Sequence, residues 1–517
     1  MYTTDTYLFT LFLALCVALV RSWLVPRRAK DLLPLPPSPP SDPLIGHMRL
    51  LMGATDISKE YGRWSSKLGS DIISFKLLGE TMIILNSTNM AEDLLAKRSS
   101  IYSDRPQFHS TMGTSDRLLG WANNTAVISY GERWRTQRRM THELLHKRAS
   151  EELSPLIVKN SRLALQQLLE EPDRFESHLR RQVLMAGSSI IKAVYGYEAT
   201  SSNDTLFETV SCAVDGFSRS IIASNFYVNL FPWMQYIPAW FPGAQWKRKA
   251  LVWRWQTEQM LHVPYNWTRE KMGTGSAPPS MLRHILSKYV KEPSKEEKET
   301  VLWAAGSLFA AGTDTTVSST LILIVAMAMY PEVQTKAQAE VDSILCGNRF
   351  PEIEDQQSMP YVEAVIKEAL RWRSVLPLGV PHAAIEDDVY KGYRIPKGAA
   401  IIANQRAMSF DERVYPNPEC FDPSRFLDPS TPEAPAFGFG RRSCPGIHFA
   451  RTSLFMVASG LFAFFDIRPK LDSEGCPIKL TAEMKQNVLV SQPTAFEVDI
   501  KPRSEKHEQI LRAWVDI

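Results

Sequence analysis

Apolar residues recur at helical spacing over long stretches in the middle of the chain. This spacing predicts helices over the ranges 131–149, 151–170, 206–222, 297–330 and 358–373. Shorter runs rich in β-branched and aromatic residues, with Gly or Pro nearby, predict the strands Ile72–Leu77, Thr81–Leu85, Tyr390–Ile395 and Ala399–Ala403. The pattern therefore indicates a mainly α-helical fold with a minor β-sheet region.

One apolar stretch is long enough to cross a membrane. Val301–Met329 carries Asp314 as its only charged residue, so length and composition alone predict a span. However, polar residues occupy its middle, at Gly312–Thr316, and an ionised carboxylate facing lipid is costly. We therefore expect a central helix that is buried inside the protein.

The N-terminus has the pattern of a membrane anchor, which we assign to residues 1–30. Thr6–Val20 carries no charge, and basic residues follow it at Arg21, Arg27, Arg28 and Lys30. A cleaved signal peptide is the alternative, but its charges would precede the apolar run. Basic residues after the anchor place the rest of the chain in the cytosol.

The anchor is followed by residues 31–46, which contain six prolines and predict a stiff hinge. No comparable linker follows, so residues 47–517 are expected to form one catalytic domain. Lys and Arg (59) nearly balance Asp and Glu (56), and the net charge of +3 gives no indication of a nucleic-acid partner. The six cysteines show no CxxC spacing, so a metal would have to come inside a cofactor or rest on a single thiolate.

The segment Phe437–Gly446 has the composition of a loop that holds a flat ligand. Its glycines let the backbone approach a ligand closely, and Gly440 and Gly446 can take conformations closed to other residues. Backbone N–H groups in such a turn would favour the thiolate of Cys444. Taken alone, a buried free cysteine in a glycine-rich turn remains the alternative.

Five positions of this loop resemble the FxxGxRxCxG haem-binding motif of the cytochrome P-450 family. The matching residues are Phe437, Gly440, Arg442, Cys444 and Gly446. The resemblance implies a single cytochrome P-450 fold in which Cys444 is the axial thiolate ligand of haem b, as in that family. It also implies that Arg442 meets a haem propionate and that the other motif residues surround the cofactor.

Weaker motifs occur in the order that the family has. Ala311–Thr316 is similar to its oxygen-activation motif, which implies that Asp314 and Thr315 relay protons and that Gly312 leaves room for dioxygen. Trp134 and Arg138 match a WxxxR pair that reaches a propionate, and His382 stands where the family often has a residue for the other propionate. Without the cysteine loop, each of these would be read as an ordinary core or surface residue.

Glu368 and Arg371 form an ExxR pair on one predicted helix face, which by itself is usually a solvated salt bridge. In the family this pair joins an arginine of a later loop, and Arg425 stands at the expected place. We therefore expect a buried structural network of Glu368, Arg371 and Arg425.

The resemblance implies a haem-thiolate monooxygenase that uses dioxygen to hydroxylate or otherwise oxidise a lipophilic small molecule. No dinucleotide or flavin fingerprint is evident, so electrons are expected from a separate NADPH-cytochrome P-450 reductase on the same endoplasmic reticulum membrane. The chain is most like fungal members of secondary metabolism. Desaturation, ring formation or isomerisation remains one alternative, and a non-enzymatic haem-binding or sensing protein another.

The substrate pocket is expected to draw on mostly apolar regions of the chain. These are residues 105–125, the region near 210–235, Phe309, Ala310, Val375–Val380 and Val488–Val490.

Overall fold

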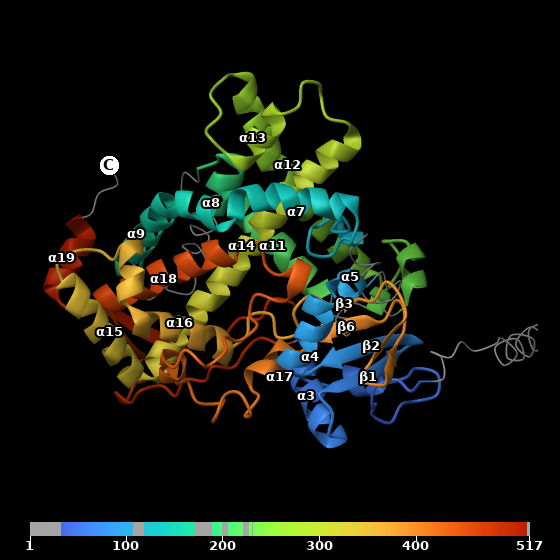
Figure 1. Ribbon diagram of the computed structural model, residues 1–517. Helices are drawn as coiled ribbons and strands as arrows, with labels where there is room; N and C mark the ends of the chain where they lie inside the picture. Colours follow the sequence, from blue (N-terminus) through green and yellow to red (C-terminus); the bar gives the residue numbers. More distant parts are fainter. Residues whose placement is uncertain are drawn as a thin grey trace, which may run out of the picture.

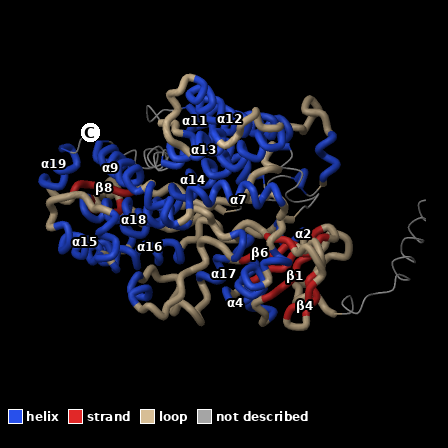
Figure 2. Tube along the Cα trace, turned by 45° about the horizontal axis from the view of Figure 1, so that its top comes forward, coloured by secondary structure: helices blue, strands red, loops and turns tan. Residues whose placement is uncertain are grey.

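The computed structural model describes residues 33–106, 118–170, 189–198, 205–220, 227–229, 231–486 and 488–513. The predicted membrane anchor, residues 1–30, lies outside these described residues. Within them, strands gather mainly at one end of the molecule and helices make up the remainder, as Figures 1 and 2 show. The expectation of a mainly helical fold with a minor sheet is confirmed.

The helical part is built around long segments whose apolar faces meet in one core. Its helices are α7 (Glu132–Leu145), α8 (Lys147–Glu152), α9 (Ser154–Glu170), α11 (Thr205–Ser220), α12 (Gln245–Gly273), α13 (Met281–Ser287), α14 (Lys295–Met329), α15 (Pro331–Leu345), α16 (Pro360–Trp372), α18 (Ile447–Phe464) and α19 (Glu505–Ala513). Shorter helices lie beside the strands: α2 (Met48–Met52), α3 (Ile57–Leu68), α4 (Thr88–Ala91), the π-helix η2 (Glu92–Lys97), α5 (Ser99–Tyr102) and α17 (Gln405–Ser409).

The main sheet has four strands in the order β1-β2-β6-β3. They are β1 (Ile72–Leu77), β2 (Glu80–Leu85), β6 (Ala400–Ala403) and β3 (His382–Ala383). The pair β1/β2 is antiparallel, β2/β6 is parallel and β6/β3 is antiparallel. Two further pairs stand apart, β4 (Asp388–Tyr390) with β5 (Tyr393–Ile395) and β7 (Phe465–Pro469) with β8 (Val498–Pro502).

The expected single strand Tyr390–Ile395 is wrong, because the chain turns back in its middle. Lys391 and Gly392 both have positive φ, +50° and +81°. Two such residues make the tight turn that suits the twist of an antiparallel pair. The segment is therefore the hairpin β4–β5.

The expected helix 131–149 is likewise interrupted. His146 leaves helical geometry, with ψ at 162°, and its ring accepts a hydrogen bond from the Ala149 N–H. A side chain that accepts a bond from the first turn caps a helix start. The stretch is accordingly two helices, α7 and α8.

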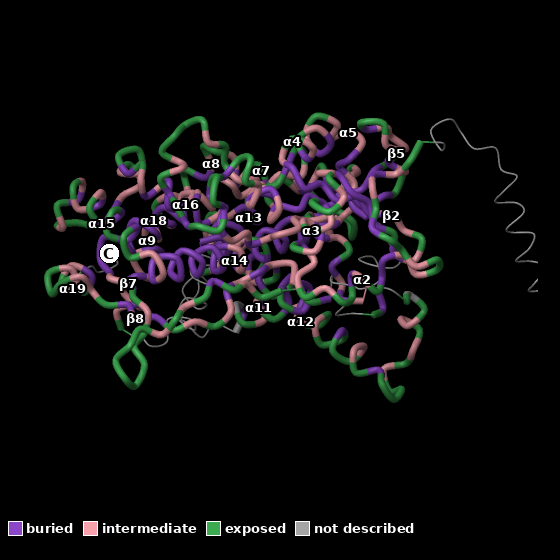
Figure 3. Tube along the Cα trace, turned by 90° about the horizontal axis from the view of Figure 1, so that it is seen from below, coloured by how far each residue is buried: buried purple, intermediate pink, exposed green. Residues whose placement is uncertain are grey.

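Helix α14 runs through the middle of the helical part and packs against α7, α11, α12, α16 and α18. Ser294 and Glu297 form a capping box at its start. Two described helices, α14 and α18, are long and apolar enough to cross a membrane, but both are largely buried in the protein, as Figure 3 shows. The expectation of a buried central helix is confirmed.

The proline-rich segment contacts the domain wherever the structure describes it. The Ser74 N–H of β1 donates to the carbonyl of Pro37, and the Ser74 hydroxyl donates to Pro36. Farther along, the Arg394 N–H of β5 donates to Pro34. These bonds fix the direction in which the chain enters the domain.

Candidate active site

A cavity of about 340 Å³ lies where the long helix α14 meets the loop that precedes α18. Apolar residues form most of its lining. They come from α11 (Val214, Phe217), α14 (Leu308, Ala310, Ala311), the segment after α16 (Val375, Leu376, Val380), the cysteine loop (Phe437, Phe439) and a late loop (Leu489, Val490). These regions overlap those expected for the pocket, although Phe309 points into the core and does not line it.

Cys444 is the thiol of this cavity. Its N–H donates to the Phe437 carbonyl, which closes the loop that begins at Phe437. Cys444 lies deep in the protein, and its accessible surface is the part that lines the cavity. Burial raises the pKa of the thiol, while the Gly446 N–H and the nearby Arg138 cation lower it. A metal at this position would shift the balance to the thiolate.

The glycines of this loop serve different needs. Gly438 and Gly440 have φ of +72° and +55°, whereas Gly446 lies at −91°. A Cβ on Gly440 would collide with the carbonyl oxygen of Leu95 in η2. Gly440 therefore allows one backbone to rest on another, and neither Gly440 nor Gly446 lines the cavity. The expectation of a special conformation is correct for Gly440 and wrong for Gly446.

Positive charge collects at one side of the cavity. Its described lining contains Arg105, Arg138 and Arg442 and no carboxylate; Asp104 lies close by. Burial lowers the pKa of all three guanidinium groups, that of Arg442 to about 10. An arginine nevertheless keeps its proton at neutral pH. The cluster is thus buried positive charge that an anionic ligand would neutralise.

Trp134 and Arg138 of α7 both face the cavity, as the motif predicts. The Arg138 guanidinium donates to the carbonyl of Ser443, next to the thiol, at 2.6 Å. The Arg442 guanidinium lies over the Trp134 ring, 4.5 Å from its centroid. It also donates to the backbone carbonyls of Ser103 and Ile128, each at 2.8 Å. This cation is held mainly by uncharged partners.

His382 lines the same side of the cavity. Burial, together with the nearby Arg105 and Arg442, lowers the pKa of the imidazole well below its usual value, so the ring is neutral. Its Nδ1 lies 2.8 Å from the Tyr102 carbonyl, which requires the proton on Nδ1.

Arg105 is expected from the sequence only as the first residue of the pocket region 105–125 and is not identified there as a cationic group of the site. Its guanidinium is buried and donates to the carbonyls of Ala126, Val380 and Pro381. The backbone of residues 126 and 380–381 is thereby joined beside the cavity. A lone arginine in a loop has no sequence signal that would reveal such contacts.

The residues of the expected oxygen-activation motif point to different sides of α14, and only some of them line the cavity. Ala311 and Thr315 line the cavity, and the Thr315 hydroxyl donates to the Ala311 carbonyl at 2.8 Å. Asp314 is half-buried and is not among the lining residues. A Cβ on Gly312 would lie 3.0 Å from Ile190, so the glycine allows close packing of α14 against Ile190, and Gly312 is not among the described lining residues.

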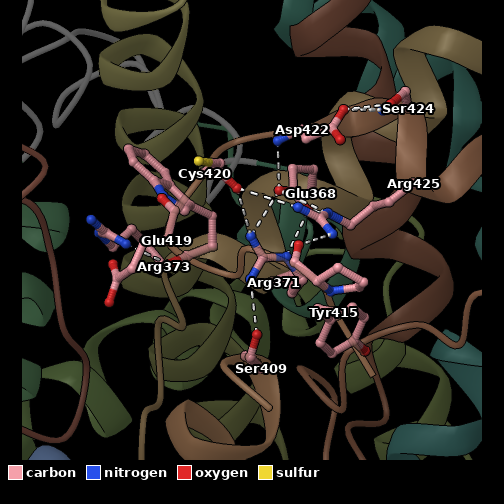
Figure 4. Close-up of polar contacts among 12 residues, drawn as sticks. Glu368, Arg371, Arg373, Ser409, Tyr415, Glu419, Cys420, Asp422, Ser424 and Arg425 are labelled. Carbon is pink, nitrogen blue, oxygen red and sulfur yellow. Dashed lines mark hydrogen bonds and ion pairs between the residues drawn. The ribbon is translucent and has the colours of Figure 1, made fainter. Parts of the chain in front are cut away.

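Glu368, Arg371 and Arg425 form the expected buried network (Figure 4). Both Glu368 oxygens accept from Arg371, at 2.7 and 2.8 Å, and Arg425 approaches the same carboxylate at 3.3 Å. The Asp422 N–H also donates to Glu368, and Arg371 donates to the carbonyls of Ser409 and Cys420. The network ties α16 to the two segments that lead toward the cysteine loop.

These groups fit haem. The cavity combines one accessible thiol, apolar walls and a buried cationic side that has room for carboxylates to pair. Such a site defines the class of haem-thiolate proteins. The chain belongs to the cytochrome P450 family, whose model matches residues 36–498. It is accordingly an oxidoreductase whose cofactor is haem with an axial cysteine thiolate, and a purely ligand-binding role is set aside.

Fungal relatives match nearly the whole chain. The cytochrome P450 monooxygenase COX2 of Coprinopsis cinerea is 38% identical over 479 residues, which cover 91% of this chain and 89% of that protein. The cytochrome P450 monooxygenase 208 of Postia placenta is also 38% identical, over 93% and 92%. The tryptamine 4-monooxygenase of Psilocybe cyanescens is 35% identical, over 91% and 94%. The resemblance to fungal members is confirmed.

Proposed function

We propose that this protein is a monooxygenase of fungal secondary metabolism that oxidises a lipophilic small molecule with dioxygen and NADPH-derived electrons, and that Cys444 is its iron ligand. One observation carries the proposal: Cys444 and the α14 residues Ala311 and Thr315 line a single apolar cavity. When bound there, haem supplies the activation of dioxygen, which thiolate donation promotes.

The other residues around the cavity are proposed to hold the cofactor. Arg105, Arg138 and Arg442 would neutralise the acidic groups of the cofactor, and Trp134 and His382 would complete that side of the site. Phe437 would contact the cofactor from the cavity wall, while Gly440 and Gly446 shape the loop that presents the thiol.

Thr315 is the proton-handling group at the cavity. Its hydroxyl donates to the Ala311 carbonyl, so an oxygen lone pair stays available to accept a hydrogen bond from a water molecule. Asp314, one residue earlier and outside the lining, passes protons to it through intervening water. Water relays of this kind need only polar partners within hydrogen-bond reach.

A different oxidative outcome is the second candidate. Desaturation, ring formation or isomerisation would use the same thiolate and pocket. The hydroxyl of Thr315 on the cavity wall favours the activation of dioxygen, which needs a supply of protons and is common to hydroxylation and desaturation. Product analysis after incubation with reductase and NADPH distinguishes these outcomes: a product heavier by one oxygen supports hydroxylation, and loss of hydrogen supports desaturation.

We further propose that the chain sits in the endoplasmic reticulum membrane through residues 1–30, with the catalytic domain in the cytosol beside its reductase. Exposed aromatic side chains support membrane contact. They are Trp233 and Tyr236 of the 3₁₀ helix η5 (Pro232–Tyr236), Trp240 and Phe241 of the segment that follows it, and Trp255 in the first half of α12. Amphipathic aromatic rings are favoured at membrane interfaces.

The deciding experiment compares carbon monoxide difference spectra of reduced wild-type, Cys444→Ala and Cys476→Ala proteins. Wild type and the Cys476 variant should show the red-shifted band of a thiolate-ligated haem, and the Cys444 variant should lack it. Cys476 is a suitable control because its thiol is also free but lies outside the cavity lining. A normal band in Cys444→Ala would refute the assignment of the ligand.

A further inference from the structure

The hydroxyl of Ser218 lies at a junction between two walls of the cavity. Ser218 belongs to α11 and is buried. Its Oγ accepts hydrogen bonds from two successive backbone N–H groups, those of Leu489 at 2.9 Å and Val490 at 3.2 Å. One side chain thus fixes a loop from another part of the sequence.

Both segments that this contact joins contribute residues to the cavity wall, although Ser218 itself does not. Val214 and Phe217 contribute from α11, and Leu489 and Val490 contribute from the loop. The next residue continues the connection, because the Ser491 N–H donates to the Val375 carbonyl at 2.8 Å. Three separate parts of the wall are therefore linked through this loop, and Ser218 supplies the side-chain contact.

The helix end that carries Ser218 is itself held firmly. Phe217 stacks on Trp121, with ring centroids 4.3 Å apart and planes 15° from parallel. The Trp121 indole donates to the Thr257 hydroxyl of α12 at 2.8 Å. These contacts hold Ser218 in place. If its hydrogen bonds were lost, we therefore expect the loop that carries Leu489 and Val490 to shift and α11 to stay.

We propose that Ser218 is a positioning residue that sets where Leu489 and Val490 stand in the pocket, and so which lipophilic molecules the enzyme accepts. This inference rests on the proposed function, because it takes the cavity beside Cys444 as the substrate pocket. Ser218 does not line the cavity and acts through the backbone that it holds.

The test uses two iron-binding probes of different size, imidazole and 4-phenylimidazole, titrated into the purified haem protein and followed by the shift of the haem absorption band. In wild type the phenyl group contacts the apolar wall and strengthens binding. In Ser218→Ala this advantage should shrink about 5-fold, which corresponds to losing roughly one net hydrogen bond. Binding of imidazole itself should stay unchanged.

Matched variants separate positioning from general damage. Ser220→Ala removes a buried hydroxyl of the same helix whose bond goes to the Phe217 carbonyl of α11 itself, so it should keep the wild-type advantage. Ser218→Thr keeps the acceptor and should restore most of it. Ser218→Cys nearly preserves the volume but has a weak acceptor, so it should move the advantage in the same direction as Ala, and it decides the question if Ser218→Ala does not fold.

Two results would overturn the inference: the same probe ratio in Ser218→Ala or Ser218→Cys as in wild type, or an equal change in Ser220→Ala. Failure of the proposed function looks different, since the wild-type protein itself would then lack the carbon monoxide band.

Discussion

Glu368 and Arg371 show what a buried ion pair contributes at the scale of single residues. Both side chains are fully buried; Glu368 also accepts a bond from the Asp422 N–H, and Arg371 donates to the carbonyls of Ser409 and Cys420. An intact pair of this kind adds little net stability, but removal of one member strands the other without its countercharge. Its value therefore lies in fixing α16 against the segments around it.

Glu368→Gln should lower the free energy of unfolding by about 3–5 kcal/mol, because two buried arginines lose their shared carboxylate. Arg413→Ala is the control: Arg413 pairs with Asp71 and Asp411 on the surface, so its loss should cost under about 1 kcal/mol. Urea denaturation followed by tryptophan fluorescence measures both. Equal effects of the two substitutions would contradict the structural role.

Arg138→Leu should weaken retention of haem. The substitution removes the bond to Ser443 and the cation that stabilises the neighbouring thiolate. A hydrogen bond from a charged group is worth roughly 1.5–3 kcal/mol, so we expect haem to dissociate at least about 10-fold faster. Transfer of haem to apomyoglobin measures this rate. The neighbouring Arg139 does not line the cavity, and Arg139→Leu should leave the rate unchanged.

The sequence predicted Trp134, Arg138, Arg442 and Cys444 because each belongs to a spaced motif, and the structure brings all four to one cavity. It could not predict Ser218, whose importance comes from a loop 271 residues away in the chain. Contacts of that kind depend on tertiary packing and leave no local pattern.

At the scale of elements, the cysteine loop depends on its contact with η2. The backbone at Gly440 touches the backbone at Leu95, so the loop cannot approach η2 with any side chain there. A flexible side chain could rotate away from an added Cβ, but the backbone of Leu95 could not move without displacing η2. The position of the thiol is thus coupled to a helix more than three hundred residues earlier.

Gly440→Ala and Gly438→Ala form a matched pair that tests this coupling. Both glycines have positive φ, which costs an alanine roughly 1–2 kcal/mol. A Cβ at Gly438 meets nothing within 4 Å, whereas one at Gly440 meets the Leu95 backbone. Gly440→Ala should therefore be the more destabilising by at least about 1 kcal/mol. The midpoints of thermal unfolding of the two haem-free proteins provide the comparison, because Gly438 lines the cavity and Gly440 does not.

Most predicted helices and strands appear within a few residues of their expected ends, because their apolar periodicity is strong. The errors fall where one residue changes the direction of the chain. At Lys391–Gly392 the glycine was a usable turn signal, whereas the capping role of His146 depends on ring geometry that composition does not reveal. Several helices lie outside the predicted ranges, among them α12, α15 and α18, and α12 continues through Pro264.

At the scale of the whole molecule, the burial of α14 and α18 determines how the chain is placed relative to a membrane. Neither helix is free to meet lipid, since each packs on several neighbours. Every described residue should consequently lie on one side of the membrane that the N-terminus is proposed to cross.

Three exposed cysteines test this arrangement: Cys212 precedes α14, Cys346 lies between α14 and α18, and Cys476 follows α18. In sealed microsomes, variants that keep one of the three should all react with a membrane-impermeant maleimide added to the cytosolic side. Cys420 and Cys444 are retained in each variant, and a variant lacking Cys212, Cys346 and Cys476 gives the background. Protection of Cys346 alone would instead indicate that the two helices span the bilayer.

The proline segment has one more consequence, which concerns solubility. Strand β1 is an edge strand of its sheet. Its Ser74 N–H donates to the carbonyl of Pro37, and without this bond it would be an unpaired donor to which a strand of another molecule could bind. Proline has no N–H of its own, so the covering segment accepts a bond without offering a new donor row beyond it. The prolines therefore end the ladder of the sheet and protect the molecule from edge-to-edge aggregation.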